Sequence, residues 1–260
     1  MKAKWKKFAV RLALTTMVMV FGLIALLLNP NVMFAHAVTH GKFIVYANTP
    51  LDEATLAPFL DGAIQRVEGC ELYDDGYHYK IILAHNSFYN KIDNLIFDPY
   101  AAARPTANNI IVKAPVDLEA KVALTDRSRI DLTYLLSHEM IHCLQANSYG
   151  MAKFNPFSPP PMWKLEGYPE YISRPELHNK GQDQLREQIS QYLKWEASLN
   201  DGWIQVSDNH HLPGIYVKGR LMTTYLMEVK EMTYDDLLKE QVKEEEVYQA
   251  MLSWAATTDP

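Results

Sequence analysis

The hydrophobic pattern divides the chain into a short N-terminal segment and a long body. Residues 2–11 carry several basic side chains, and residues 12–28 contain no ionisable side chain. A basic stretch before an apolar run is typical of a segment that enters a membrane with its N-terminus on the cytoplasmic side. The Ala35-His36-Ala37 sequence then offers the small-x-small pattern that signal peptidase accepts. We therefore expect residues 1–37 to be either a signal peptide cleaved after Ala37 or a retained membrane anchor.

Beyond position 37 the apolar residues follow two different periods. Strand patterns cover residues 43–47, 79–84 and 110–112. Helical periodicity covers residues 52–67, 130–148, 166–172, 182–198, 215–228, 234–239 and 244–254. The helix over 130–148 is expected to follow an N-cap at Asp126 or Ser128 and to end before Gly150. Strands first and helices afterwards predict an α+β fold, with a small mixed sheet and helices in the N-terminal half and a mainly helical C-terminal half.

Composition and charge narrow the class of protein. The chain is 48% hydrophobic and 22% charged, which is typical of a globular protein. Residues 1–37 hold five basic and no acidic side chains, so residues 38–260 carry 20 Lys and Arg against 31 Asp and Glu. An acidic body repels phosphate backbones, so no nucleic-acid partner is expected. Cys70 and Cys143 are too few for a disulfide scaffold, and they could form one bridge or remain two free thiols.

A short motif lies inside the helix expected over 130–148. Residues 138–142 read His-Glu-Met-Ile-His. Positions four apart lie on one face of a helix, so His138 and His142 can direct their imidazoles at one metal ion. Glu139 follows the first histidine and can reach a water molecule on that metal without binding the metal itself. The spacing therefore predicts two metal ligands and one general base.

A catalytic zinc site usually has three protein ligands. One family pattern continues the motif with glycine and a third histidine, but this chain has Gln145 and Ser148 at those positions, which excludes it. Another pattern takes a glutamate from a later helix. Glu166 and Glu170 are four residues apart in the segment 162–171, so both can lie on one helical face.

The two motifs together resemble those of the gluzincin metallopeptidases of the peptidase MA clan. The HEMIH motif is followed by a W-x-x-E-G-x-x-E-Y sequence, Trp163 to Tyr171. The resemblance implies a zincin-like fold, one Zn²⁺ ion and a peptide or protein substrate. It implies that His138, His142 and Glu166 are the zinc ligands, and that Glu139 is the general base. It also implies that Glu170 accepts a hydrogen bond from a ligand histidine.

One residue departs from the family pattern. Pro169 stands where the family has alanine. Proline is tolerated in the first turn of a helix and distorts deeper turns. A helix that begins near Leu165 or Glu166 would therefore keep both glutamates on one face, whereas an earlier start could swing Glu170 away from the site.

The expected function is that of an exported zinc-dependent metallopeptidase, in which Glu139 deprotonates a zinc-bound water that attacks a peptide bond. The alternatives are a catalytically silent zincin-fold binding module at the cell surface, or a zinc amidase acting on cell-wall peptides. Tyr216 is the preferred candidate for stabilising the oxyanion, ahead of His210 and His211. The strand near residues 108–112 is the candidate substrate-binding edge. The protein is expected to be secreted or held on the outer face of the cytoplasmic membrane, touching the membrane only through residues 1–37, and its oligomeric state is left open.

Overall fold

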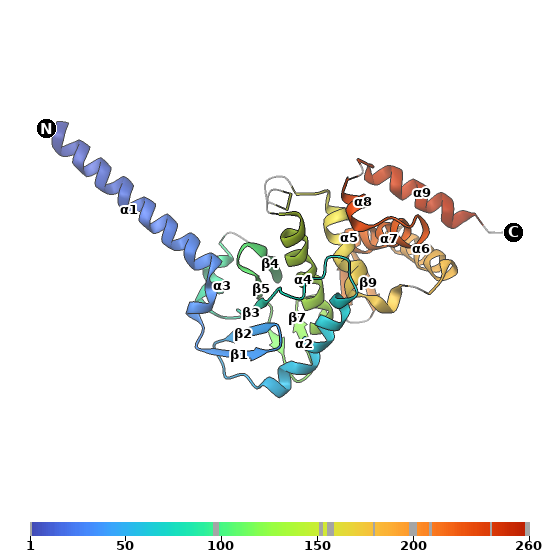
Figure 1. Cartoon of the computed structure of the whole chain (residues 1–260), viewed down its shortest axis with the longest axis horizontal. Helices are drawn as coiled ribbons and strands as arrows, with labels where there is room; N and C mark the ends of the chain where they lie inside the picture. The colour runs from blue at the N-terminus through green and yellow to red at the C-terminus, as the bar shows by residue number, and fades with distance from the viewer. Residues whose placement is uncertain are drawn as a thin grey trace.

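The computed structural model describes residues 2–95, 99–150, 153–154, 159–178, 180–197, 202–207, 210–239 and 241–257, leaving aside the side chains of 2–4, 106, 206, 207 and 210. Helix α1 (Lys2–Leu28) projects from a body with a sheet beside it and a group of helices at the C-terminal end (Figure 1). Helix α4 (Leu132–Tyr149) lies between these two parts (Figure 1).

The main sheet has five strands in the order β1-β2-β3-β5-β4. The strands are β1 (His36–His40), β2 (Phe43–Ala47), β3 (Tyr79–Leu83), β4 (Ala101–Arg104) and β5 (Asn109–Val112). The three central strands run parallel, and β1 and β4 run antiparallel to their neighbours. The sheet is therefore mixed, and β4 lies at one edge.

Both faces of this sheet are covered. Alternate side chains of a strand point to opposite faces, so Ile81 and Ile110 belong to the main core whereas Ile82 and Ile111 belong to a second, smaller core. Helix α2 (Glu53–Glu68) and α4 contribute to the main core. The second core is completed by Tyr89 of α3 (Phe88–Asp93) and by residues near the end of α1.

The remaining elements are mostly helical. The further α-helices are α5 (Met162–Ser173), α6 (Gln182–Glu196), α7 (Gly214–Thr224), α8 (Tyr234–Lys239) and α9 (Glu244–Ala256). There is also a π-helical turn (Tyr225–Val229), with short 3₁₀ turns at Pro30–Met33 (η1), Pro105–Ala107 and Pro175–Leu177. Two small β structures complete the fold: the hairpin of β9 (Trp203–Ser207) and β10 (His210–Pro213), and the sheet of β6 (Val116–Asp117), β7 (Val122–Leu124) and β8 (Arg129–Asp131). The expected α+β class is confirmed, although the hairpin β9–β10 was not expected in the helical half.

Helix α4, which carries the HEMIH motif, begins later than expected. Residues Arg129–Asp131 pair with β7 as strand β8, so α4 starts at Leu132. Asp131 is the N-cap, and its Oδ1 accepts a hydrogen bond from the backbone N–H of Tyr134 at 2.8 Å. The expectation of a cap at Asp126 or Ser128 is therefore wrong. Ser128 instead bonds the backbone of His211 through its hydroxyl. The helix ends at Gly150 as expected, where φ is +75°.

The structure also corrects the expected edge strand and answers the question of the two cysteines. The strand near residues 108–112 is interior, because β5 lies between β3 and β4. The edge strand nearest α4 is instead β4, which pairs with the other side of β5. Cys70 and Cys143 are both buried free thiols.

Candidate metal centre

Helix α4 brings two imidazoles together. His138 and His142 lie one turn apart on this largely buried helix, and their Nε2 atoms are 3.2 Å from each other. Their ring centroids are 4.9 Å apart. Both rings therefore direct the same nitrogen to a single point at the surface of α4, as the four-residue spacing predicted.

Helix α5 supplies a carboxylate to the same point. Glu166 Oε2 lies 3.3 Å from the Nε2 atom of His138 and 3.3 Å from that of His142. This oxygen is buried and has no hydrogen-bond donor of regular geometry in the described part of the chain. His138, His142 and Glu166 therefore form a cluster that could hold one metal ion.

The outer nitrogen of each histidine also faces an acceptor. His138 Nδ1 lies 3.1 Å from Glu170 Oε1, and His142 Nδ1 lies 2.9 Å from Gln145 Oε1. An acceptor at Nδ1 keeps the proton on that nitrogen, which leaves a lone pair on Nε2. In each neutral imidazole, the acceptor at Nδ1 therefore favours the tautomer that leaves Nε2 free for a metal ion.

Gln145 is held in place by groups from two other helices, α5 and α8. Its Nε2 donates to the Tyr234 hydroxyl at 2.7 Å and to the Leu165 carbonyl at 3.2 Å. The Leu165 carbonyl would normally accept from the residue four positions later, but that residue is Pro169, which has no N–H. Pro169 thus leaves free the carbonyl that Gln145 uses.

The early start of α5 does not displace Glu170. The helix begins at Met162, so Pro169 is well inside it, yet Glu170 stays against His138. Glu170 also accepts hydrogen bonds from the Tyr134 hydroxyl and, at 3.1 Å, from Arg174 Nε. Two hydrogen bonds and the ion-pair contact with His138 therefore hold this buried carboxylate in position.

The charged groups of the cluster raise the pKa values of its histidines and lower those of its glutamates. Burial lowers the pKa of His138, but Glu166 and Glu170 outweigh burial and raise it to about 10. Burial likewise opposes ionisation of Glu170, but His138 and Arg174 lower its pKa to about 2. Burial would raise the pKa of Glu166, but His142 and His138 hold it well below its usual range. The carboxylates are therefore negative and favour positive charge between the rings.

The cluster opens into a cleft of about 300 Å³. Glu139 is buried and lines this cleft beside His138 and His142. Tyr216 of α7 lines it too, with its ring centroid 5.8 Å from that of His138 and the two rings nearly parallel. Ala101, Ala102 and Ala103 of the edge strand β4 line the cleft as well.

Most of the site residues expected from the sequence lie close together in the structure. His138, Glu139, His142, Glu166, Glu170 and Tyr216 all meet at or beside the cleft. His211 does not, since its Nδ1 contacts the Arg127 carbonyl at 2.8 Å. The side chain of His210 lies outside the described part of the structure. A larger cavity of about 850 Å³, between α2 and α5, includes none of the cluster residues.

Gln145 is a partner of the cluster that sequence reasoning missed, as are Tyr134 and Arg174, which bond Glu170. Its position three residues after His142 places it on the same face of α4, which is a signal that could have found it. The sequence matches no protein-family model and no curated protein.

Proposed function

We propose that this chain is an exported zinc-dependent metallopeptidase of gluzincin type, with a zincin-like fold. His138, His142 and Glu166 hold one Zn²⁺ ion, and Glu139 is the general base. The observation that carries the proposal is the triangle of ligand atoms, whose sides are 3.2, 3.3 and 3.3 Å. In a tetrahedral site with bonds of about 2.0–2.1 Å, neighbouring ligand atoms are about 3.3 Å apart. The triangle therefore fits one face of a zinc tetrahedron.

The donor set favours a catalytic rather than a structural ion. Two imidazoles and one carboxylate suit zinc, and three protein ligands leave a coordination position open. His138, His142 and Glu166 all line the cleft, so an ion held by them would be within reach of a substrate there. When bound, the ion supplies Lewis-acid chemistry, making water nucleophilic near neutral pH and polarising a carbonyl group.

Glu139 has the position that proton transfer requires. It is buried, lines the cleft beside both histidines, and is not part of the metal-ligand triangle. Its carboxylate can take a proton from the attacking water and pass it to the amine that leaves. A merely structural metal site has no use for such a base, which favours an active enzyme over a silent binding module.

Tyr216 is proposed to stabilise the oxyanion. Burial raises the pKa of the Tyr216 phenol well above its usual value, so the hydroxyl keeps its proton. A neutral O–H beside His138 can donate a hydrogen bond to negative charge that develops on the carbonyl oxygen.

The edge strand β4 is proposed to bind the substrate. Its residues Ala101–Arg104 pair with β5 on one side, and Ala101, Ala102 and Ala103 line the cleft. An extended peptide can add to an exposed edge as a further strand. The small alanine side chains leave room for the side chains of that peptide.

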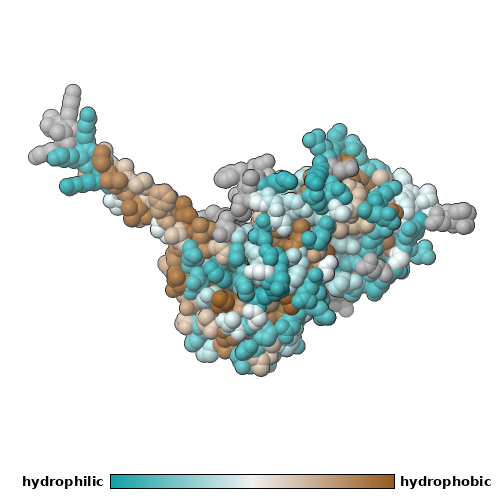
Figure 2. All heavy atoms as spheres, in the orientation of Figure 1, coloured by the Kyte–Doolittle hydropathy of each residue, from teal (hydrophilic) through white to brown (hydrophobic). Residues whose placement is uncertain are grey.

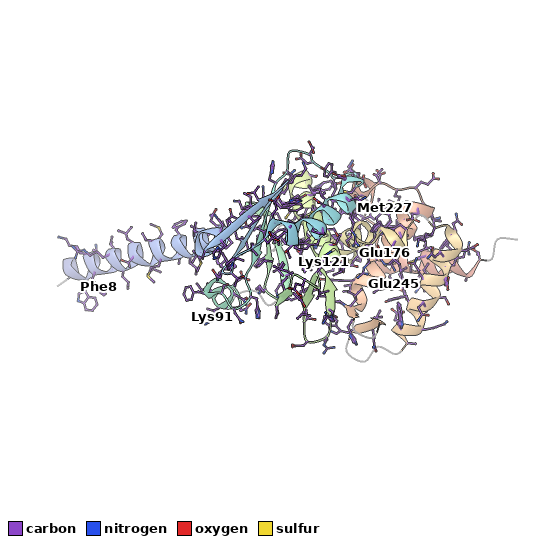
Figure 3. All side chains as sticks on the ribbon, turned by 90° about the horizontal axis from the view of Figure 1, so that it is seen from below. Phe8, Lys91, Lys121, Glu176, Met227 and Glu245 are labelled. Atoms are coloured by element: carbon purple, nitrogen blue, oxygen red, sulfur yellow. The ribbon has the colours of Figure 1, made fainter. Side chains whose placement is uncertain are left out.

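Glu139→Gln tests the proposal. It removes the base but keeps the side-chain size, so we expect peptide cleavage to fall by about 10²–10⁴-fold while zinc content stays near one ion per chain. The readout is mass spectrometry on a peptide library and on purified cell-wall muropeptides, with metal analysis of the same samples. The control is Glu176→Gln, at an exposed position after α5 (Figure 3).

Several outcomes would contradict the proposal. Undiminished cleavage by Glu139→Gln would remove the mechanism. Zinc binding without turnover on any substrate would favour the binding module, and cleavage of muropeptides alone would favour the cell-wall amidase.

A further inference from the structure

The surface of α1 matches a lipid bilayer. Its residues Trp5–Leu28 form a 24-residue span that contains an 18-residue window of mean hydropathy 2.2, and no residue of that window is buried in the body. At 1.5 Å per residue the whole span is about 36 Å long, and its uncharged residues 12–28 cover about 26 Å of a hydrocarbon core of about 30 Å, with Lys and Arg side chains able to reach the head groups beyond it. Figure 2 shows the hydrophobic surface running along the helix toward the body, and Phe8 projects into open space in Figure 3. The basic side chains lie at the far end.

The other end of α1 is built into the sheet domain. The Leu28 carbonyl accepts a hydrogen bond of 2.8 Å from the side chain of Asn109, a fully buried residue of β5. The Leu27 carbonyl accepts one of 3.3 Å from the hydroxyl of Tyr89. The last carbonyls of a helix have no partners within it, so these two bonds cap α1 with groups of the body.

The residues just after α1 cover the second face of the sheet. Met33 and Phe34, together with Leu27, pack against a buried cluster. The members of that cluster are Ile82, Ala84, Tyr89 and Ile111, each at most 1% exposed. Pro30 is buried as well, and strand β1 then begins at His36.

Cleavage after Ala37 would remove part of this domain. His36 and Ala37 pair with Ala47 and Tyr46 of β2, so β1 would lose two of its five residues. The apolar cover of β3 and β5 would also be lost, and Asn109 would lose the acceptor of its buried amide. Exposing apolar surface and unpairing a buried polar group both destabilise a fold.

We propose that α1 is retained as a membrane anchor and that residues 27–40 are an integral part of the folded domain. The partner of the exposed face of α1 is the lipid bilayer. The end of α1 and the residues after it pack on β3 and β5. The next strand in the sheet is β4, which borders the cleft. The candidate site therefore belongs to a domain held directly at the membrane surface, without a flexible linker between helix and sheet.

Fractionation of the full chain tests whether α1 is retained. The chain carries a C-terminal tag and is expressed in a bacterial host with active signal peptidase. We expect all 260 residues, by intact mass, in the membrane pellet after alkaline carbonate extraction. A soluble product that begins at Val38 would overturn the proposal. Neither result depends on metal or activity, so this test and that of the metallopeptidase can fail separately.

A pair of variants tests whether the segment is docked. Phe34→Ala removes a side chain that packs on the second core, whereas Val32→Ala removes one that is 72% exposed in the same segment. In detergent-solubilised full chain, we expect Phe34→Ala to lower Tm by about 3–6 °C and Val32→Ala by about 1 °C or less. Equal shifts for the two variants would contradict the docked arrangement. The milder pair Met33→Ala and Val32→Ala serves if Phe34→Ala does not accumulate.

Discussion

At the scale of single residues, the candidate metal centre depends on the groups that contact the outer nitrogens of its histidines as much as on the candidate ligands. Glu170 faces the outer nitrogen of His138, and Gln145 accepts from that of His142. Each partner is itself fixed, Glu170 by Tyr134 and Arg174, and Gln145 by Tyr234 and Leu165. Such contacts orient a ligand ring and raise its basicity, so they contribute to metal affinity without touching the metal.

Gln145→Leu removes one of these contacts at nearly constant volume. It leaves the outer nitrogen of His142 without an acceptor, so we expect zinc affinity to fall by about 10–100-fold. The measurement is competition with a chromogenic chelator. Asn147→Leu, an exposed amide two residues along the same helix, is the control and is expected to bind zinc normally. Equal affinities for the two variants would show that Gln145 does not position His142.

The candidate ligands and Glu170 could be predicted from the sequence, whereas the groups that fix Glu170 and Gln145 could not. His138 and His142 follow from a four-residue spacing on one helix, and Glu166 follows from a second local motif. The contact between Gln145 and the Leu165 carbonyl joins two helices and depends on Pro169 leaving that carbonyl free. Side-chain patterns along the chain contain no such information about backbone acceptors.

At the scale of elements, a close approach of two helices places Glu166. A Cβ atom on Gly167 of α5 would lie 2.5 Å from the Gly219 carbonyl oxygen and 2.5 Å from Thr223 Oγ1, both in α7. A Cβ on Gly219 would in turn lie 3.1 Å from the Trp163 carbonyl oxygen. The glycine after Glu166 is therefore required by packing, and it lets α7 bring Tyr216 beside the cluster.

Gly167→Ala is expected to force α5 and α7 apart, because its nearest contact is backbone. We expect a loss of about 1–3 kcal/mol in stability, a lower Tm and weaker zinc retention. Thermal unfolding with and without zinc provides the measurement. Gly69→Ala is the control, since a Cβ there meets nothing within 4 Å. A Gly167→Ala variant as stable as Gly69→Ala would contradict the close packing.

The bounds of a helix or strand could be predicted where they depend on the local sequence pattern, but not where they depend on pairing between strands. The pattern at 234–239 gave α8 with both ends, and that at 43–47 gave β2. The apolar Ile130 fitted a helical period, but β-pairing with Ala123 takes it into β8. Local sequence patterns also do not specify the order of strands in a sheet, so they could not show that β4, and not β5, lies at the edge.

At the scale of the whole molecule, the candidate metal lies where the two halves of the chain meet. His138 and His142 come from α4, whose helix packs on the sheet, and Glu166 comes from α5, which packs on α7 in the helical half. A bound ion would therefore link the halves. The same body carries α1, so chemistry at the cluster would take place beside the membrane.

Metal analysis of the purified full chain, paired with peptide cleavage before and after a chelator, tests the central claim most directly. The account predicts one zinc ion per chain, cleavage that stops with the chelator and returns with zinc, and loss of both in His142→Ala and Glu166→Ala. A chain that takes up no metal when zinc is supplied would contradict it, as would a folded His142→Ala variant that retains zinc as tightly as the unaltered chain.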